Sequence, residues 1–208
     1  MNKSEKFWDR MSKTFDKPTK SKKPKLNTAV EKARTHLRPS DIILDYGCAT
    51  GTKTLEIANA VKEAHAIDIS SKMIDIAQRK AREQKIENVH FRQSSIFDKR
   101  YENESFDVIL AFNILHLLVD TDKVLKSINE LLKPGGLFIS TTPCMGEKMN
   151  ILRLFIQPLS KLGILPEITF FKVAEMSNLI TDNNFKIIES EIPPKDAHSY
   201  YVVAKKQA

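Results

Sequence analysis

The sequence predicts an α/β protein built on a doubly wound, Rossmann-like sheet of seven strands, mostly parallel, that ends in an antiparallel hairpin. Short apolar runs alternate with helical patterns over about 110 residues, from residue 28 to residue 140. Glycine turns stand at both ends of this alternation. Beyond it, two final strands are joined by a loop with Pro193-Pro194 that is too short for a parallel crossover, so they must pair antiparallel.

Each expected element depends on a local pattern. Apolar runs predict the five strands of the alternating part, at residues 42–44, 65–69, 89–91, 106–112 and 137–140. Core-spaced apolar residues and capping side chains predict helices over residues 28–37 and 52–59, after Ser70 or Ser71, and after Asp120 or Thr121. Pro134-Gly135-Gly136 predicts a turn before the fifth strand. The last helix is expected at 174–182, and the hairpin strands at 186–192 and 199–204.

The composition is that of an ordinary globular protein. Of 208 residues, 41% are hydrophobic and 28% are charged, which is enough for a sizeable core and excludes wholesale disorder. The longest nearly apolar run, 108–119, is shorter than a membrane-spanning helix, and no secretory signal is visible. The two cysteines, Cys48 and Cys144, provide neither a disulfide framework nor the spacing of a metal site. We therefore expect a reduced, cytoplasmic protein without a metal ion.

Most of the net charge of +7 belongs to an N-terminal arm, residues 1–25, which contains nine Lys or Arg and three Asp or Glu. Within it, Phe7, Trp8, Met11 and Phe15 share one face of a helix expected over residues 4–16. We expect this amphipathic helix to dock on its own domain, residues 26–208, with peripheral contact to a membrane as an alternative. The cations could also attract nucleic acid, or simply form a solvated tail.

Residues that follow the first and second strands form the candidate ligand site, because open parallel sheets bind ligands beyond the carboxyl ends of their strands. The segment "DYGCATG", residues 45–51, follows the first strand. Gly47 and Gly51 allow a tight turn and a close approach of a ligand to the backbone. Asp68 ends the second strand, where its carboxylate can accept both hydroxyls of a ribose. The pattern predicts a ligand that contains a nucleoside.

The glycine spacing separates this site from a dinucleotide site. Dinucleotide folds use G-x-G-x-x-G, whereas this chain has G-x-x-x-G with Asp45 two residues before Gly47. A carboxylate at Asp45 would repel a pyrophosphate and would suit an ammonium or a sulfonium group. We therefore expect a positively charged nucleoside rather than a nicotinamide dinucleotide.

These motifs resemble those of the class I S-adenosylmethionine-dependent methyltransferases, in particular small single-domain members that act on small molecules, quinones or lipids. The resemblance extends over nearly the whole chain, and its motifs are "IILDYGCATG" (42–51), "AIDIS" with Met73, "FDVILAFNILHLL" (106–118) and "LLKPGGLFIS" (131–140). It implies S-adenosylmethionine as cofactor. It also implies a lid helix at "FWDRMSKTFDK" and a last strand inserted antiparallel into the sheet.

The resemblance further implies roles for individual residues. It assigns the methionine part of the cofactor to Asp45, Tyr46, Gly47 and Gly51, the ribose to Asp68, the adenine to Ile69, Met73, Ser95 and Ile96, and the amino group and methyl to Asn113. Two positions depart from the family pattern. Ala49 replaces a common glycine, a mild change in size, and Ser95 replaces a common aspartate, which predicts a weaker contact with adenine.

The acceptor and the catalytic group are less specified by the sequence. His116, three residues after Asn113, is the best-placed titratable side chain for a general base, and the alternative is a histidine packed at a strand–helix junction. The apolar segment 145–171 is expected to form a cap that closes, together with the aromatic helix, over a small hydrophobic or lipid-like acceptor; plain core packing is the alternative. Methylation of nucleic-acid bases is disfavoured, because no N-P-P-Y motif follows the fourth strand.

Three functions remain open at this point. The first is a methyltransferase for a small or lipid-like acceptor. The second is an RNA methyltransferase that uses the basic arm. The third is a different class on the same fold, either a nicotinamide-dependent oxidoreductase or a non-catalytic nucleoside-binding module. The oligomeric state is not indicated by the sequence.

Overall fold

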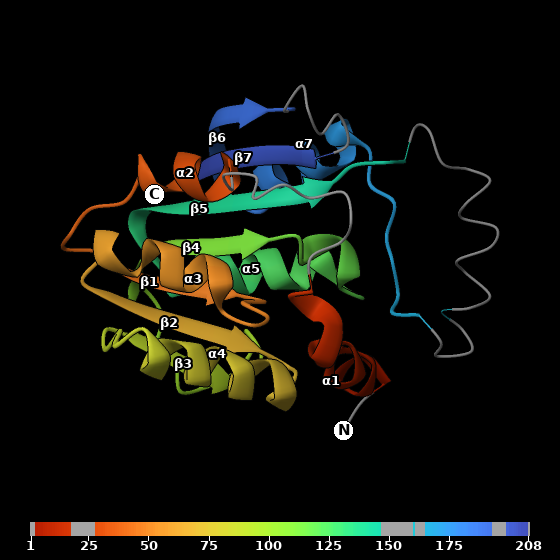
Figure 1. Cartoon of the computed structure of the whole chain (residues 1–208). Helices are drawn as coiled ribbons and strands as arrows, with labels where there is room; N and C mark the ends of the chain where they lie inside the picture. Colours follow the sequence, from red (N-terminus) through yellow and green to blue (C-terminus); the bar gives the residue numbers. More distant parts are fainter. Residues whose placement is uncertain (1–2, 18–27, 147–159, 161–164, 193–198, 208) are drawn as a thin grey trace. The chain divides into compact units, whose positions relative to one another are not determined.

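The computed structural model describes residues 3–17, 28–146, 160, 165–192 and 199–207 (Figure 1). The strands of these residues form a seven-stranded mixed sheet in the order β3-β2-β1-β4-β5-β7-β6, which confirms the predicted fold class. The chain divides into two compact units, residues 1–95 and 96–208.

The first unit contains three parallel strands, β1, β2 and β3. Their bounds are Ile42–Tyr46, Glu63–Asp68 and Val89–Gln93. Its helices are α1 (Lys3–Phe15), α2 (Thr28–Arg34), α3 (Thr52–Ile57), the 3-10 turn η1 (Ala58–Ala60) and α4 (Ser71–Glu83). Asp45 lies opposite Ala66, and Asp68 lies opposite Gln93, so both acids stand at the carboxyl ends of their strands as predicted. Ile43 and Leu44 are fully buried, as in a parallel strand that is covered on both faces.

The second unit contains the other four strands. Their bounds are β4 Phe106–Phe112, β5 Leu132–Pro143, β6 Phe185–Glu191 and β7 Ser199–Lys206. Its helices are η2 (Leu115–Leu117), α5 (Thr121–Leu131) and α7 (Val173–Asp182). Strands β4 and β5 are parallel, whereas β7 is antiparallel to both β5 and β6. The last strand is therefore inserted between β5 and β6, which confirms the expected antiparallel hairpin.

One expected boundary is wrong. The sequence predicted a turn at 134–136 before the fifth strand, but β5 already begins at Leu132, which pairs with Phe106. The register then shifts, so that Val108 pairs with Leu137, and Gly135 takes a φ of 75° within this irregular stretch. The glycines therefore produce a bulge inside the strand, because pairing with β4 starts before the turn residues.

The predicted helix caps are present. The Ser70 hydroxyl accepts a hydrogen bond from the Met73 amide at 3.1 Å, and the Asp120 carboxylate accepts one from the Lys123 amide at 3.0 Å. No helix in the described ranges is long and apolar enough to span a bilayer. Residues 18–25 of the arm and most of the expected cap, 147–159 and 161–164, lie outside the described residues.

Candidate cofactor site

The glycine turn after β1 is fastened to the second strand by backbone hydrogen bonds. The amides of Gly47 and Cys48 both donate to the carbonyl of Ile67, at 2.8 and 3.0 Å. The amide of Gly51 then donates to the carbonyl of Cys48 at 2.9 Å, which closes the turn before α3 begins. The turn is therefore held in one conformation next to the end of β2.

The carboxylate of Asp68 is oriented by two backbone amides. Its Oδ2 accepts from the amide of Ala49 at 3.0 Å, and its Oδ1 accepts from the amide of Ser70 at 2.8 Å. A carboxylate has about four acceptor positions, so each oxygen keeps one for a further donor such as a ribose hydroxyl. Burial and, to a smaller extent, the charge of Asp9 raise the pKa of Asp68, while the backbone amides of Ser70, Ala49 and Ile69 oppose that shift because they stabilise the charged form. This geometry fits the pair of hydroxyls of a bound nucleoside.

Asp45 occupies a more enclosed position than the sequence suggested. Its side chain is 2% exposed, and its Oδ2 accepts a hydrogen bond from the hydroxyl of Thr54 at 2.6 Å. Burial raises the pKa of Asp45 to about 6. The carboxylate is therefore mostly ionised at neutral pH, although burial makes its ionisation unfavourable. Its hydrogen-bond partner is Thr54 in the first turn of α3.

Three positions in the turn, Gly47, Ala49 and Gly51, adopt left-handed backbone conformations. Gly51 has a φ of 74°, and a Cβ there would lie 2.6 Å from Cζ of Phe91 and 2.8 Å from Cβ of Ala77. Ala49 has a φ of 49°, which costs an L-residue about 1–2 kcal/mol. The sequence analysis considered only the size of the extra methyl at Ala49; the structure adds backbone strain.

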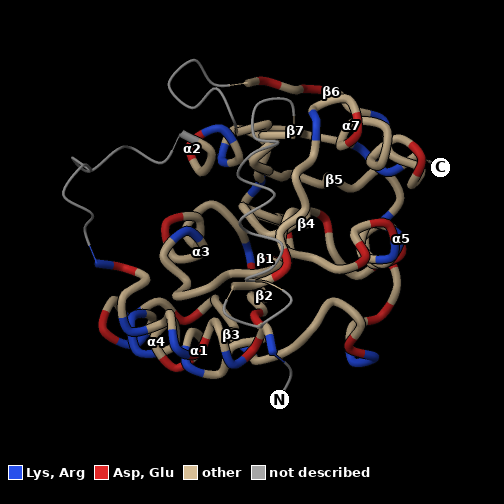
Figure 2. The backbone as a smooth tube through the Cα atoms, turned by 90° about the vertical axis from the view of Figure 1, so that its right-hand side faces the viewer, with Lys and Arg blue, Asp and Glu red and all other residues tan. Residues whose placement is uncertain are grey.

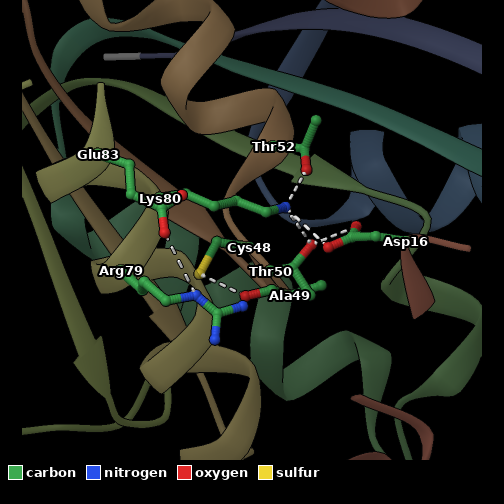
Figure 3. Close-up of polar contacts among 8 residues, drawn as sticks. All are labelled: Asp16, Cys48, Ala49, Thr50, Thr52, Arg79, Lys80 and Glu83. Carbon is green, nitrogen blue, oxygen red and sulfur yellow. Dashed lines mark hydrogen bonds and ion pairs between the residues drawn. The ribbon is translucent and has the colours of Figure 1, made fainter. Parts of the chain in front are cut away.

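Helix α1 is joined to the glycine turn through Asp16, directly after its end. Oδ1 of Asp16 accepts from the hydroxyl of Thr50 at 2.8 Å, and Oδ2 pairs with the ammonium of Lys80 at 2.8 Å. Figure 3 shows that ammonium pointing toward Asp16, Thr50 and Thr52, and its distance to the Thr52 hydroxyl is 2.7 Å. The chain from the N-terminus is thus fixed to the turn that the sequence predicted as the cofactor site.

Two further acids of α1 bind beside the ends of β2 and β3. Oδ1 of Asp9 accepts from the hydroxyl of Ser70 at 2.6 Å, and Oε1 of Glu5 accepts from the amide nitrogen of Gln93 at 3.1 Å. Helix α1 accordingly lies along α4 (Figure 1). The sequence analysis missed these contacts, although the i, i+4 spacing of Glu5 and Asp9 was a usable signal for one helix face.

The docking face of α1 was not specified by the sequence, which predicted only that the helix docks on its own domain. Its hydrogen bonds to the first unit come from the acidic face, where Ser12 is buried. The physical reason is that the receiving surface is polar, since it consists of hydroxyls, a side-chain amide and an ammonium. Phe7 and Trp8 are half-buried, and Phe15 is 46% exposed.

The residues expected around adenine are found in different surroundings. Met73 is buried. Tyr46, which was expected at the methionine part of the cofactor, is buried as well, and burial raises the pKa of its hydroxyl. Ile69 and Ser95 are half-buried, and the carbonyl of Ile69 accepts from the side chain of Gln93 at 3.0 Å. Met73 belongs to the core-facing side of α4, so its contact with a ligand stays a prediction.

In the second unit, the predicted residues lie at and after the end of β4. Ile96 is buried, and the exposed Asn113 has a φ of 60°. The amide of Asn113 donates to the carbonyl of Thr141 at 2.8 Å, and its Oδ1 accepts from the Thr141 hydroxyl at 3.2 Å. These two bonds hold Asn113 in a conformation that asparagine tolerates better than most residues.

His116 lies in the 3-10 turn η2, and its side chain is half-buried. Burial lowers its pKa to about 4. Its Nδ1 has no hydrogen-bond partner among the described residues, while its carbonyl accepts from the amide of Thr169 at 2.7 Å. The imidazole is therefore neutral at physiological pH, and its unbonded Nδ1 is buried. Among all the residues that the structure describes, no group of three or more His, Cys, Asp or Glu side chains is arranged to hold a metal ion.

Comparison with known proteins assigns the family. A model described as a methyltransferase domain matches residues 37–194. The chain belongs to the class I S-adenosylmethionine-dependent methyltransferases. It is 29% identical, over 150 residues, to the ubiquinone/menaquinone biosynthesis C-methyltransferase UbiE of Vibrio parahaemolyticus, a match that covers 70% of this chain and 54% of that protein. The chain thus spans about half the length of this curated relative, and only 24% of an uncharacterised Synechococcus protein with which it shares 37% identity over 98 residues.

Solved structures show the same fold at low identity. The [4+2]-cyclase SpnF matches with a TM-score of 0.79 and 16% identity, covering 99% of this chain and 95% of that one. The geranyl diphosphate C-methyltransferase of Streptomyces coelicolor, solved with S-adenosyl-L-homocysteine, matches with a TM-score of 0.69 and 15% identity, covering 87% and 79%. Because a cyclase and a methyltransferase share this fold, the fold alone does not decide the activity.

Proposed function

We propose that this methyltransferase binds S-adenosylmethionine beyond the ends of β1 and β2 and methylates a small hydrophobic or lipid-like acceptor. The observation that carries the proposal is the Asp68 carboxylate, which Ala49 and Ser70 orient while both of its oxygens keep acceptor capacity. The matching family model supports the same cofactor. The donor set fits the cofactor because acids and backbone groups suit its hydroxyls and its positive charges.

The remaining contacts to the cofactor follow from the positions of the residues. The turn at Tyr46, Gly47 and Gly51, with the buried charge of Asp45, would hold the methionine part. Further contacts are proposed for Ile69, Met73, Ser95 and Ile96 around adenine, and for Asn113 at the amino group. Asp45 favours a sulfonium ligand over a pyrophosphate, since like charges repel in a buried site.

His116 is the proposed general base. When bound, S-adenosylmethionine supplies a methyl group activated by its sulfonium sulfur, so a base is needed only where the acceptor must lose a proton. The neutral imidazole of His116 can take that proton, and its low pKa keeps it in the basic form throughout the physiological range. The same low pKa makes it a weak base, which suits an acidic acceptor such as a hydroquinone better than an amine.

Two observations support a hydrophobic acceptor. The relatives include quinone methyltransferases by name, and one structural neighbour is a geranyl diphosphate methyltransferase. Residues 145–171 are rich in leucine, isoleucine and phenylalanine, as an acceptor-binding cap would be. In this proposal the methyltransferase domain, residues 26–208, follows the basic arm, residues 1–25, in the sequence. We assign the protein to the cytoplasm, where its free cysteines would stay reduced.

Isothermal calorimetry tests the cofactor site. We expect micromolar binding of S-adenosylmethionine and its demethylated product, and no binding of NAD. Asp68→Ala should weaken binding at least about a hundredfold, since it removes two hydrogen bonds to a charged group. Asp75→Ala, which removes an exposed acid of α4, is the matched control and should leave affinity unchanged. Unchanged affinity in a folded Asp68→Ala protein, or binding of NAD, would refute the site.

His116→Gln tests the base with labelled methyl donor and a panel of quinols and lipids as acceptors. We expect turnover to fall about a hundredfold or more while donor affinity stays the same. The wild-type rate should show no His116 inflection between about pH 6 and pH 8, because the pKa of His116 is about 4. Full turnover in the variant would assign His116 to packing alone.

A further inference from the structure

Helix α1 uses its acidic face to bind the protein. Glu5 and Asp9, followed by Asp16 in the turn after the helix, point at Gln93, Ser70 and Lys80. At about 100° per residue, these three acids fall within an arc of about 40°. All the negative charge of this segment is therefore directed at its own domain.

A stripe of cations occupies another face of the same helix. It consists of Lys3, Lys6, Arg10 and Lys13, which recur every three or four residues within an arc of about 80°. All four side chains are exposed, and none forms an ion pair within the described part of the chain. Figure 2 colours the Lys and Arg positions of the backbone blue, including those of the α1 tube. We call this set the cationic stripe.

An aromatic cluster adjoins the cationic stripe. Phe7 and Trp8 meet edge to face at 5.1 Å between ring centroids, and Trp8 meets Phe15 at 6.5 Å. The guanidinium of Arg10 lies 5.6 Å from the centre of the Phe7 ring, which joins the two features. Phe15 is 46% exposed and, at about 100° per residue, lies with Trp8 on the side of Phe7 away from the cations, so apolar surface is available on that flank.

We propose that α1 docks on an anionic lipid surface with Phe7 at the centre of the contact, the cationic stripe on one flank and Trp8 and Phe15 on the other, at the depth of the headgroups. Helices that lie in a membrane interface carry Lys and Arg on their polar face and Trp, Phe or Leu on the other. Tryptophan prefers that depth because its ring is apolar and its N–H is polar. An RNA backbone would use the cations but would leave the aromatic cluster without a role, so a lipid surface fits better.

The acidic contacts give this docking a structural consequence. The side of α1 turned to the protein binds Thr50 and Ser70, which follow β1 and β2, and Gln93, which ends β3. Phe7 lies on the opposite side, between the cationic stripe and the other aromatic rings. Docking would therefore present the cofactor turns next to the bilayer, where hydrophobic acceptors are dissolved. The inference goes beyond the proposed function and does not depend on it, since lipid binding needs neither methyl donor nor acceptor.

The test uses the full chain and vesicles of phosphatidylcholine with and without phosphatidylglycerol. Trp8 is the only tryptophan, so its fluorescence reports on α1 directly. With the anionic vesicles we expect flotation of the protein, a blue shift of Trp8 emission and quenching by brominated lipid. Neutral vesicles should produce none of these changes, and raised salt should reverse the binding.

Two variants distinguish binding by the cationic stripe from attraction by the overall positive charge of the protein. Replacing Lys3, Lys6, Arg10 and Lys13 by alanine should lower the partition coefficient at least about a hundredfold, since each cation near such a surface contributes about fivefold. The matched control replaces three lysines and one arginine exposed elsewhere, Lys62, Arg82, Lys99 and Lys186, and should retain most of the binding.

Several outcomes would overturn the proposal. One is no binding to anionic vesicles at physiological salt. A second is equal loss in the stripe and control variants, which would indicate a diffuse charge effect. A third is tight binding of single-stranded RNA without a lipid-induced shift of Trp8, which would make the arm a nucleic-acid contact. Calorimetry with S-adenosylmethionine on the same samples is independent, so failure of the cofactor site would be recognised separately.

Discussion

The ends of β1 and β2 and the end of β4 contrast in how completely their polar groups are engaged. At the first two strands, Asp45 is bonded to Thr54, and Asp68 is bonded to two amides. After β4, Asn113 is exposed, and Nδ1 of His116 has no partner among the described residues. Both regions follow parallel strands, but after β4 a buried imidazole nitrogen is left without a bond in the described part of the chain, although Thr141 holds Asn113.

The contrast shows which part of the candidate site is preorganised before a ligand binds. The turn after β1 must present one conformation to a cofactor of constant shape, and preorganisation lowers the entropy cost of binding. After β4, Asn113 is proposed to meet the amino group of the cofactor, and His116 the acceptor, which varies among relatives of this fold. We therefore expect substitutions in the first region to affect folding and cofactor affinity together, and substitutions after β4 to affect turnover.

The largest expected effect is at Gly51. Gly51→Ala forces a left-handed alanine whose Cβ overlaps Phe91 and Ala77, so unfolding free energy should fall by about 3 kcal/mol or more in urea denaturation. Gly135→Ala is the matched control, with a φ of 75° but only the flexible Lys205 side chain nearby, and should cost about 1–2 kcal/mol. Equal losses of stability at both sites would mean that the backbone conformation, and not close packing against Phe91, is the reason for glycine at position 51.

The next effect concerns the buried charge of Asp45. Its native pKa is raised to about 6, so the native state holds this proton longer than the unfolded state, and stability falls as pH rises from about 4 to about 6. Asp45→Asn removes that loss and should raise stability near pH 8 by up to about 3 kcal/mol, with little change near pH 4. Thermal unfolding of the wild type and of Asp45→Asn between about pH 4 and pH 8 measures this difference in stability.

The same Asp45→Asn variant should bind S-adenosylmethionine more weakly, because the proposed partner of its positive charge is gone. A variant that is both less stable at high pH and unchanged in affinity would contradict the assignment. Asp41→Asn, another buried acid of the first unit, is a control expected to leave cofactor affinity unaltered.

The smallest effect is expected at Ala49. Ala49→Gly relieves the left-handed strain and should stabilise the protein by about 1 kcal/mol, with cofactor affinity nearly unchanged. Lys85→Gly, at a φ of 55° after α4, should produce a similar gain. Denaturation midpoints compare the two, and a loss of stability at Ala49→Gly would show that its methyl group packs favourably.

Much of the fold could be predicted because its signals are local. The apolar run at 106–112 became β4 with the expected bounds, and the hydroxyl of Ser70 caps α4 as predicted. The beginning of β5 could not be predicted in this way. Leu132 joins the strand by pairing with Phe106, and that pairing is absent from the local pattern of prolines and glycines.

The sequence by itself determined the order of strands and helices, the acids at the ends of β1 and β2, and the family. Hydrophobic periodicity and short motifs carry that information within a few residues. Only the tertiary structure decided which face of α1 binds the domain, how deeply Asp45 is buried and why position 51 must be glycine. Each of these depends on atoms from distant parts of the chain, such as Lys80 against Asp16 and Phe91 against Gly51. Close packing and desolvation arise only when such segments meet.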